Sequence, residues 1–292
     1  MRLKLLVTLL AVFLLLGCLG LGKPEIRGIK NYWGTVNESV TEIITDVTVY
    51  NPNPVPIPVK DVLTEVYVNQ LKLGEGSALS AEIKPGESTI LISTKIDNEK
   101  IPEWWMEHLK NNEKSKMRIK GYLVFDLKVT EFKYPIKEMT REIKTNLVNS
   151  IISASPGKFE LGLMKIEIVP LKSEIKSVTA EKTEVEVSYS LKNSGKIPFK
   201  IKEINYTIKM NELKFAEGSK ITEKEIGINE LITINCTIYI ENEKLKDWWV
   251  SHIKNKETTK IKMIQNVAVE ILGMTHVIPI EKEVKMTTSI LT

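Results

Sequence analysis

The sequence contains few of the residues that build reactive or metal-binding centres. Cysteine occurs twice, as Cys18 and Cys236, and histidine three times, as His108, His252 and His276. A structural zinc site needs about four ligands at short spacing, and neither a Cys/His cluster nor an HExxH pattern is present. Two cysteines also cannot provide the disulfide framework of a small secreted domain. We therefore expect no metal site, and no internal disulfide if Cys18 is modified.

Motifs for nucleotide binding, hydrolysis and nucleic-acid binding are missing as well. The GEG at 74–76 lacks the third glycine and the following helix of a dinucleotide fingerprint, and no GxSxG nucleophile elbow occurs. The 41 Lys and Arg against 37 Asp and Glu are interspersed and leave a net charge of +4, so no basic stripe is available for nucleic acid. We expect no cofactor, no small-molecule substrate and no nucleic-acid partner. An enzyme, such as a hydrolase, remains the third alternative, because spacing alone does not test a Ser-His-Asp arrangement.

Glutamine is also scarce, with Gln70 and Gln265 as its two occurrences, whereas Lys, Glu and Ile are abundant. This bias is typical of thermophile proteins and suggests a thermophilic source. The length of 292 residues and the 42% hydrophobic content suit two globular domains, each with its own core.

One long apolar run opens the chain. A cationic MRLK precedes the run from Leu5 to Gly17, which Thr8 alone interrupts, and LLGC follows at 15–18. Leu, a small residue and Cys at the end of such a run resemble a lipobox, so we expect lipidation at Cys18. The alternative is an uncleaved signal anchor. Either makes residues 1–22 a membrane anchor and places the rest of the chain on the extracytoplasmic face.

The remainder of the chain is an internal duplication. Residues 96–148 align with 240–292 at a shift of 144, and ten of the eighteen positions in 96–113 are identical. Further upstream the shift is 142. We expect two domains, 23–149 and 165–292, separated by a linker over 150–164 that is rich in small residues.

Alternating hydrophobicity predicts that both copies are mainly strands. Val185, Val187, Tyr189 and Leu191 alternate with polar residues. About seven such runs per copy, spaced by 8 to 15 residues, favour an antiparallel β-sandwich. Cys236 lies on the apolar side of a similar run, where we expect a buried, unreactive thiol.

One helix per copy interrupts the strands and carries a repeated WWxxH sequence. Ile101, Trp105 and Leu109 are spaced by four residues, as a helical apolar stripe requires. We expect each helix to close its own sandwich, with the tryptophans as a plug and the histidine packed against an indole. The alternative is an exposed tryptophan pair that binds a partner or a membrane interface. The residues concerned are Trp104, Trp105 and His108 in the first copy, and Trp248, Trp249 and His252 in the second.

The stretch NPNPVPIP at 51–58 follows a strand, and its prolines exclude a central strand. Asn51, Pro52 and Asn53, followed by an apolar-proline segment and later by IKPGES, resemble the late embryogenesis abundant type 2 domain, also called the water stress and hypersensitive response domain. In the second copy Asn193 remains, but serine and glycine follow it. The resemblance implies seven-stranded sandwiches with one helix, an association with desiccation and other stress, and no catalytic residues.

These observations predict a non-enzymatic, membrane-anchored protein with a role under stress. The expected partners are the membrane, through the anchor, and envelope proteins or polymers. The alternative is an accessory binding or scaffold subunit of a cell-envelope or transport complex.

Overall fold

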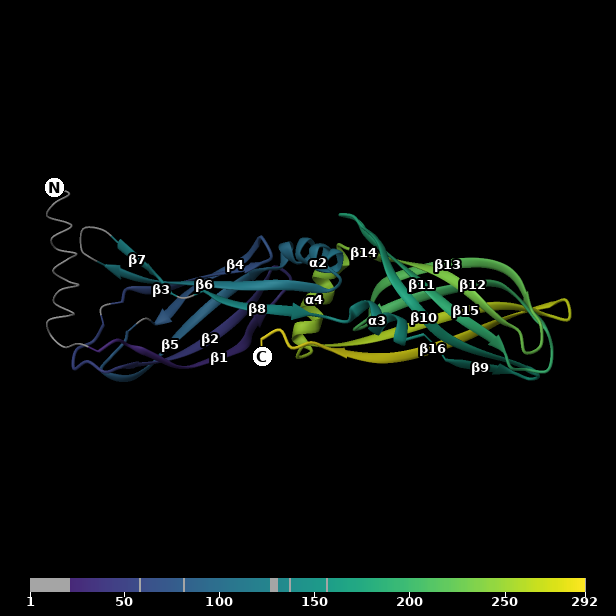
Figure 1. The fold of residues 1–292 in the computed structure, drawn as a ribbon, viewed down its shortest axis with the longest axis horizontal. Helices are drawn as coiled ribbons and strands as arrows, with labels where there is room; N and C mark the ends of the chain where they lie inside the picture. Colours follow the sequence, from purple (N-terminus) through teal and green to yellow (C-terminus); the bar gives the residue numbers. More distant parts are fainter. Residues whose placement is uncertain are drawn as a thin grey trace.

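The computed structural model describes residues 22–57, 59–80, 82–126, 131–136, 138–155 and 157–291. Cys18 and the apolar run before it lie outside these residues. The described chain forms two antiparallel β domains arranged end to end, with helices at their junction (Figure 1). The predicted fold class, mainly β with two tandem domains, is confirmed. Within the described ranges, no helix is long and apolar enough to cross a bilayer.

The first domain is one sheet in the order β1-β2-β5-β4-β3-β6-β7, with β8 also paired to β6. A short 3-10 helix η1 and helix α2 connect β5 to β6. The elements are β1 (Glu25–Val36), β2 (Val40–Asn51), β3 (Asp61–Val68), β4 (Leu71–Ser80), β5 (Gly86–Asp97), η1 (Asn98–Lys100), α2 (Ile101–Lys110), β6 (Lys114–Asp126), β7 (Glu131–Pro135) and β8 (Met139–Lys144).

The second domain is one sheet in the order β16-β15-β12-β13-β14-β11-β10-β9, and helix α4 connects β14 to β15. Each described sheet thus has eight strands, one more than the approximate number expected. The elements are α3 (Leu147–Ser153), β9 (Lys158–Leu161), β10 (Met164–Val178), β11 (Lys182–Asn193), β12 (Phe199–Met210), β13 (Leu213–Ile226), β14 (Leu231–Glu241), α4 (Lys244–Lys254), β15 (Thr258–Ile271) and β16 (Met274–Thr287).

The segment between the two domains is packed rather than extended. Residues 150–164, predicted to be a linker, include the end of α3 and all of β9. Helix α3 lies on β10, β15 and β16 of the second domain and buries Leu147, Ile151 and Ile152 there. The small residues of this stretch suggested a linker, but its isoleucine pair provides an apolar face that the second sheet covers.

The hydrophobic core is distributed unequally between the domains. In the second domain the predicted inward residues of β11, from Val185 to Leu191, are all buried. In the first domain a small separate cluster forms around Val49, Val62 and Ile90. The large cluster runs without interruption from α2 and the adjoining strands of the first domain into the second. The junction between the domains therefore belongs to the main core.

Candidate functional site

The repeated tryptophan helices lie at the junction of the two domains (Figure 1). Helix α2 begins at Ile101 with Pro102 in its first turn, where a missing backbone N–H costs no hydrogen bond, and ends at Lys110, followed by Asn111 as its C-cap. The spacing of its apolar residues predicted this helix correctly. The buried residues are Ile101, Trp104, Trp105, His108 and Leu109 in α2, and Leu245, Trp248, Trp249, Val250, His252 and Ile253 in α4.

The two tryptophan pairs contact each other across the junction. The ring centroids of Trp104 and Trp249 are 5.4 Å apart at an interplanar angle of 83°, and those of Trp105 and Trp248 are 4.7 Å apart at 71°. Edge-to-face geometry of this kind is the favourable arrangement for aromatic rings. Trp104 and Trp105 align with Trp248 and Trp249 in the repeat, so the two contacts exchange under a local two-fold relation. The helices thus cover each other, besides covering their own sheets.

The two-fold relation is broken at the edge of this cluster. The indole Nε1 of Trp249 donates to Thr41 Oγ1 of the first domain at 3.0 Å, whereas the buried Nε1 of Trp105 has no hydrogen-bond partner. Trp33 of β1 packs edge-on against Trp249, with centroids 6.1 Å apart, and donates to Glu257 Oε1 at 3.0 Å. The repeat places Ile175 at the position equivalent to Trp33, and its aliphatic side chain cannot donate this bond.

In the first domain, His108 lies in a buried chain of hydrogen bonds. Trp104 Nε1 donates to Ser115 Oγ at 3.1 Å, and this hydroxyl is 2.8 Å from His108 Nδ1. On the other side of the ring, His108 Nε2 is 2.9 Å from Thr145 Oγ1, which donates to Glu113 Oε1 at 2.9 Å. Because Thr145 gives its proton to the carboxylate, its oxygen accepts from Nε2. The neutral Nε2–H tautomer therefore satisfies every member of the chain.

The second domain repeats this chain almost atom for atom. Trp248 Nε1 donates to Thr259 Oγ1 at 2.9 Å, and Thr259 Oγ1 lies 2.7 Å from His252 Nδ1. His252 Nε2 is 2.8 Å from Thr288 Oγ1, which donates to Glu257 Oε2 at 3.0 Å. A threonine stands where the first domain has Ser115. The hydroxyl is thus common to both chains.

The electrostatics of these chains oppose acid–base chemistry at neutral pH. Burial lowers the pKa of His108 and of His252 to about 4, because desolvation disfavours the charged imidazolium. His108 is 0% exposed and Ser115 is 4% exposed. The Ser115–His108 pair resembles two members of a catalytic triad, but no substrate reaches it in this conformation, and its hydroxyl is occupied by the Trp104 indole. This chain of hydrogen bonds therefore serves to position helix α2.

The asparagines of the proline-rich motif hold a turn at the outer end of each domain. Asn51 Nδ2 donates to Val55 O at 2.9 Å, and its Oδ1 accepts from the Asn53 backbone N at 3.0 Å. Asn193 makes the same two bonds, to Ile197 O at 2.9 Å and from Gly195 N at 3.0 Å. A side chain that closes two backbone bonds in this way stabilises the turn.

The differences between the two turns follow from their neighbours. A Cβ on Gly195 would lie 2.5 Å from the Leu163 carbonyl oxygen, so that the second turn requires glycine. In the first turn, Asn53 Nδ2 instead donates to Gly22 O at 2.9 Å. Pro52 is exposed beside Gly22. The turn thus fixes the point at which residues 1–21 join the first domain.

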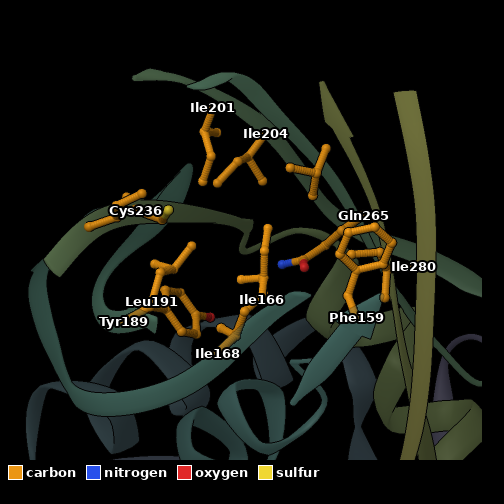
Figure 2. A pocket seen from close by; sticks show the side chains of 12 residues that line it. Phe159, Ile166, Ile168, Tyr189, Leu191, Ile201, Ile204, Cys236, Gln265 and Ile280 are labelled. Atoms are coloured by element: carbon orange, nitrogen blue, oxygen red, sulfur yellow. The ribbon is translucent and has the colours of Figure 1, made fainter. Parts of the chain in front are cut away.

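A small apolar cavity lies inside the second sheet (Figure 2). Its volume is about 30 Å³, room for roughly one water molecule, whereas ligand pockets usually measure about 300–1,000 Å³. Cys236 lines it, and the prediction of a buried thiol is confirmed. Burial raises the pKa of this thiol, which keeps it protonated and unreactive. Among the described residues, no group of three or more His, Cys, Asp or Glu is placed to hold a metal ion.

The fold and the site define a class of protein in which two tandem β domains are joined through a buried aromatic interface. The histidines at this interface, His108 and His252, are enclosed. Residues 46–139, which are 94 of the 292, match the family model described as Late embryogenesis abundant protein. The resemblance inferred from the NPN motif is therefore confirmed for this segment.

Similar proteins come from archaea and from a plant. An uncharacterized protein of Methanocaldococcus jannaschii is 27% identical over 168 residues, which cover 54% of this chain and 95% of that protein. A crystal structure of a protein from Archaeoglobus fulgidus is 28% identical and covers 43% of this chain and 98% of its own, with a TM-score of 0.37. A solution structure of an Arabidopsis thaliana protein is 18% identical and covers 42% and 82%, with a TM-score of 0.31.

Proposed function

We propose that this chain is a non-enzymatic protein of the late embryogenesis abundant type 2 family, with both β domains derived from that family. It is held at the extracytoplasmic face of a membrane by residues 1–22 and protects the cell envelope during desiccation or other stress. The observation that carries the proposal is the match of residues 46–139 to the family model. The asparagine turn supports its extension to the second domain, because Asn51 and Asn193 make the same two bonds.

The enclosed chemistry of the junction supports a non-enzymatic role. The two histidines whose repetition pointed to a site are buried and neutral, and their hydrogen bonds end on structural partners. Catalysis needs groups that meet a substrate, and the histidine chains offer none. What the arrangement provides is a rigid pair of domains that projects from one attachment point.

The attachment point supports an anchor that leaves both domains free. Gly22 is bound to the side chain of Asn53, just past the end of β2 that is opposite the β5–η1–α2 connection. An anchor in the preceding residues therefore holds the chain by one end. The second domain then lies away from the membrane that holds the anchor.

Lipid labelling of the full chain tests the anchor. Metabolic incorporation of a labelled lipid precursor should mark the wild type and Cys236→Ser, but not Cys18→Ser, whose protein should leave the membrane fraction or be held only by an uncleaved signal. A wild type without label that still remains in the membrane fraction would replace the lipid by a signal anchor.

Survival under stress tests the role. A strain that lacks the protein should lose viability after drying or osmotic shock, and the full chain, but not a chain without residues 1–22, should restore it. Equal survival of both strains, together with stoichiometric co-purification of one envelope complex from detergent, would favour the accessory-subunit alternative.

A further inference from the structure

The outer end of the second domain carries a group of exposed aliphatic side chains on three neighbouring turns. We call this group the distal tip. Soluble domains usually keep large aliphatic side chains off protruding turns, and a cluster of them marks an interaction surface. Their exposed fractions range from 41% for Leu161 to 85% for Leu272, and the residues are Leu161, Leu163, Ile228, Leu231, Leu272 and Met274.

Backbone hydrogen bonds hold two of these turns against the asparagine turn. Lys196 N donates to Leu163 O at 2.8 Å, which joins the β9–β10 turn to the segment after Asn193. Asn193 N donates to Glu230 O at 3.0 Å, which joins the β13–β14 loop to the same segment. The β15–β16 turn extends past the pairing of Lys200 with Glu270 and projects from the same end (Figure 1). The β9–β10 and β13–β14 turns therefore form one structured surface, and the β15–β16 turn lies at the same end of the domain.

The local two-fold relation at the junction places this surface at the pole opposite the attachment point. A two-fold axis perpendicular to the long axis, as in the end-to-end arrangement of the two domains, points equivalent ends in opposite directions (Figure 1). Gly22 lies at the asparagine turn of the first domain, and the distal tip lies at the asparagine turn of the second. The asparagine turn of the first domain thus lies at one pole, and the β9–β10 and β15–β16 turns lie at the other (Figure 1).

The composition of the distal tip fits a lipid surface better than a protein partner. Protein interfaces concentrate their binding energy in Trp, Tyr and Arg, none of which is among these exposed side chains. Aliphatic side chains on separate turns can each enter the acyl region while the strands behind them stay in water. The nearby carboxylate of Glu160 is paired with Lys165 Nζ at 2.5 Å, which lessens its repulsion from anionic headgroups.

We propose that the distal tip inserts into a lipid surface. The next inference rests on the proposed anchor. With that anchor at the opposite pole, the chain bridges two membrane surfaces, or two regions of one folded membrane. The affinity of the distal tip itself does not depend on the anchor. If the molecule lay flat on a single bilayer, the placement of the anchor and the distal tip at opposite poles would have no role.

A vesicle-capture assay tests the proposal with the full chain. The protein is reconstituted into phosphatidylcholine vesicles with one dye and mixed with protein-free phosphatidylcholine vesicles that carry a second dye. The wild type should co-localise the two dyes. The variant Leu163→Ser, Leu272→Ser, Met274→Ser should reduce capture by at least about tenfold, the factor that even one aliphatic side chain contributes, roughly, on entering lipid. The control Val169→Ser, Leu171→Ser, Ile221→Ser removes three exposed aliphatic side chains away from the distal tip and should capture like the wild type.

Flotation of the protein-bearing vesicles reports the anchor separately. Protein that floats but captures no acceptor vesicles would overturn the lipid-binding tip and leave the anchor intact. Capture that requires protein in both vesicle populations would mean that distal tips bind each other, and would also overturn the proposal. Protein that fails to float at all would refute both the anchor and the affinity of the distal tip for lipid.

Discussion

At the scale of single residues, the two buried histidines make the fold less stable in acid. The unfolded chain protonates a histidine near pH 6.5, whereas the folded chain protonates His108 and His252 only near pH 4. Their contribution to the free energy of unfolding is therefore fully present above pH 6.5. It is lost as the pH falls from 6.5 to 4, because the unfolded chain takes up protons in this range and the folded chain does not. The difference corresponds to about 3 kcal/mol for each histidine.

Chemical denaturation between pH 7 and pH 4 checks this prediction. The midpoint should fall steeply in this window for the wild type and for His276→Gln, whose side chain is exposed. The double variant His108→Gln, His252→Gln should be less stable at pH 7, but its midpoint should depend less on pH over the same range. An equally steep dependence in the double variant would contradict the assignment.

The asparagine turns provide a second test at this scale. Asn51→Ala or Asn193→Ala removes a side chain that closes two backbone bonds and leaves partly buried backbone groups of the turn unpaired, which should cost about 1–3 kcal/mol. Asn31→Ala, at an exposed position of β1, should cost less than 0.5 kcal/mol, roughly the range of surface substitutions. Urea titrations measure both. Equal small effects would mean that the turns hold without their asparagines.

The sequence predicted much of this residue pattern but not its partners. The repeat drew attention to His108 and His252, and Glu113 and Glu257 are identical in the same alignment. The hydroxyls of Thr145 and Thr288 are separated from these histidines by 37 and 36 residues, and only the pairing of strands brings them together. Spacing along one dimension carries no sign of such a contact.

At the scale of elements, the two tryptophan helices are expected to be energetically coupled. Trp104 and Trp248, which the helical pattern placed at the edge of the apolar stripe, are as buried as Trp105 and Trp249. The pattern showed which helix face is apolar, but not that the other helix covers its flank. Truncation of any of the four to alanine should therefore cost about 3–5 kcal/mol.

A double-mutant cycle isolates the contact across the junction. Trp104→Ala and Trp249→Ala should show a coupling of about 0.5–1.5 kcal/mol, because their rings meet edge to face. The pair Trp104→Ala and Phe159→Ala is a suitable control, since Phe159 lines the cavity in the second domain away from α2. Additive losses in the first pair would indicate that each helix serves its own domain alone. Unfolding free energies from denaturant titrations supply the cycle.

At the scale of the whole molecule, the shared core changes what an isolated domain should do. The sequence predicted two domains, 23–149 and 165–292, each with its own core, yet α3 packs on the second sheet and Trp248 and Trp249 face the other domain. We expect residues 147–292 to fold cooperatively and to form a two-fold dimer through α4. Analytical ultracentrifugation should show a dimer that Trp249→Ala converts to a monomer. If the fragment without substitutions is monomeric and melts at the same temperature as the full chain, a shared core is contradicted.

Joining the two halves in one chain has a further effect on how their contact can change. A covalent tether gives each half an effective concentration near the other of the order of millimolar, which dilution cannot lower. The junction can therefore keep an indole N–H without an acceptor at Trp105. It can also gain a bond on one side only, as between Trp33 and Glu257. In a dimer of identical chains every substitution appears twice, whereas the fused pair can diversify one half while the other retains the ancestral contact.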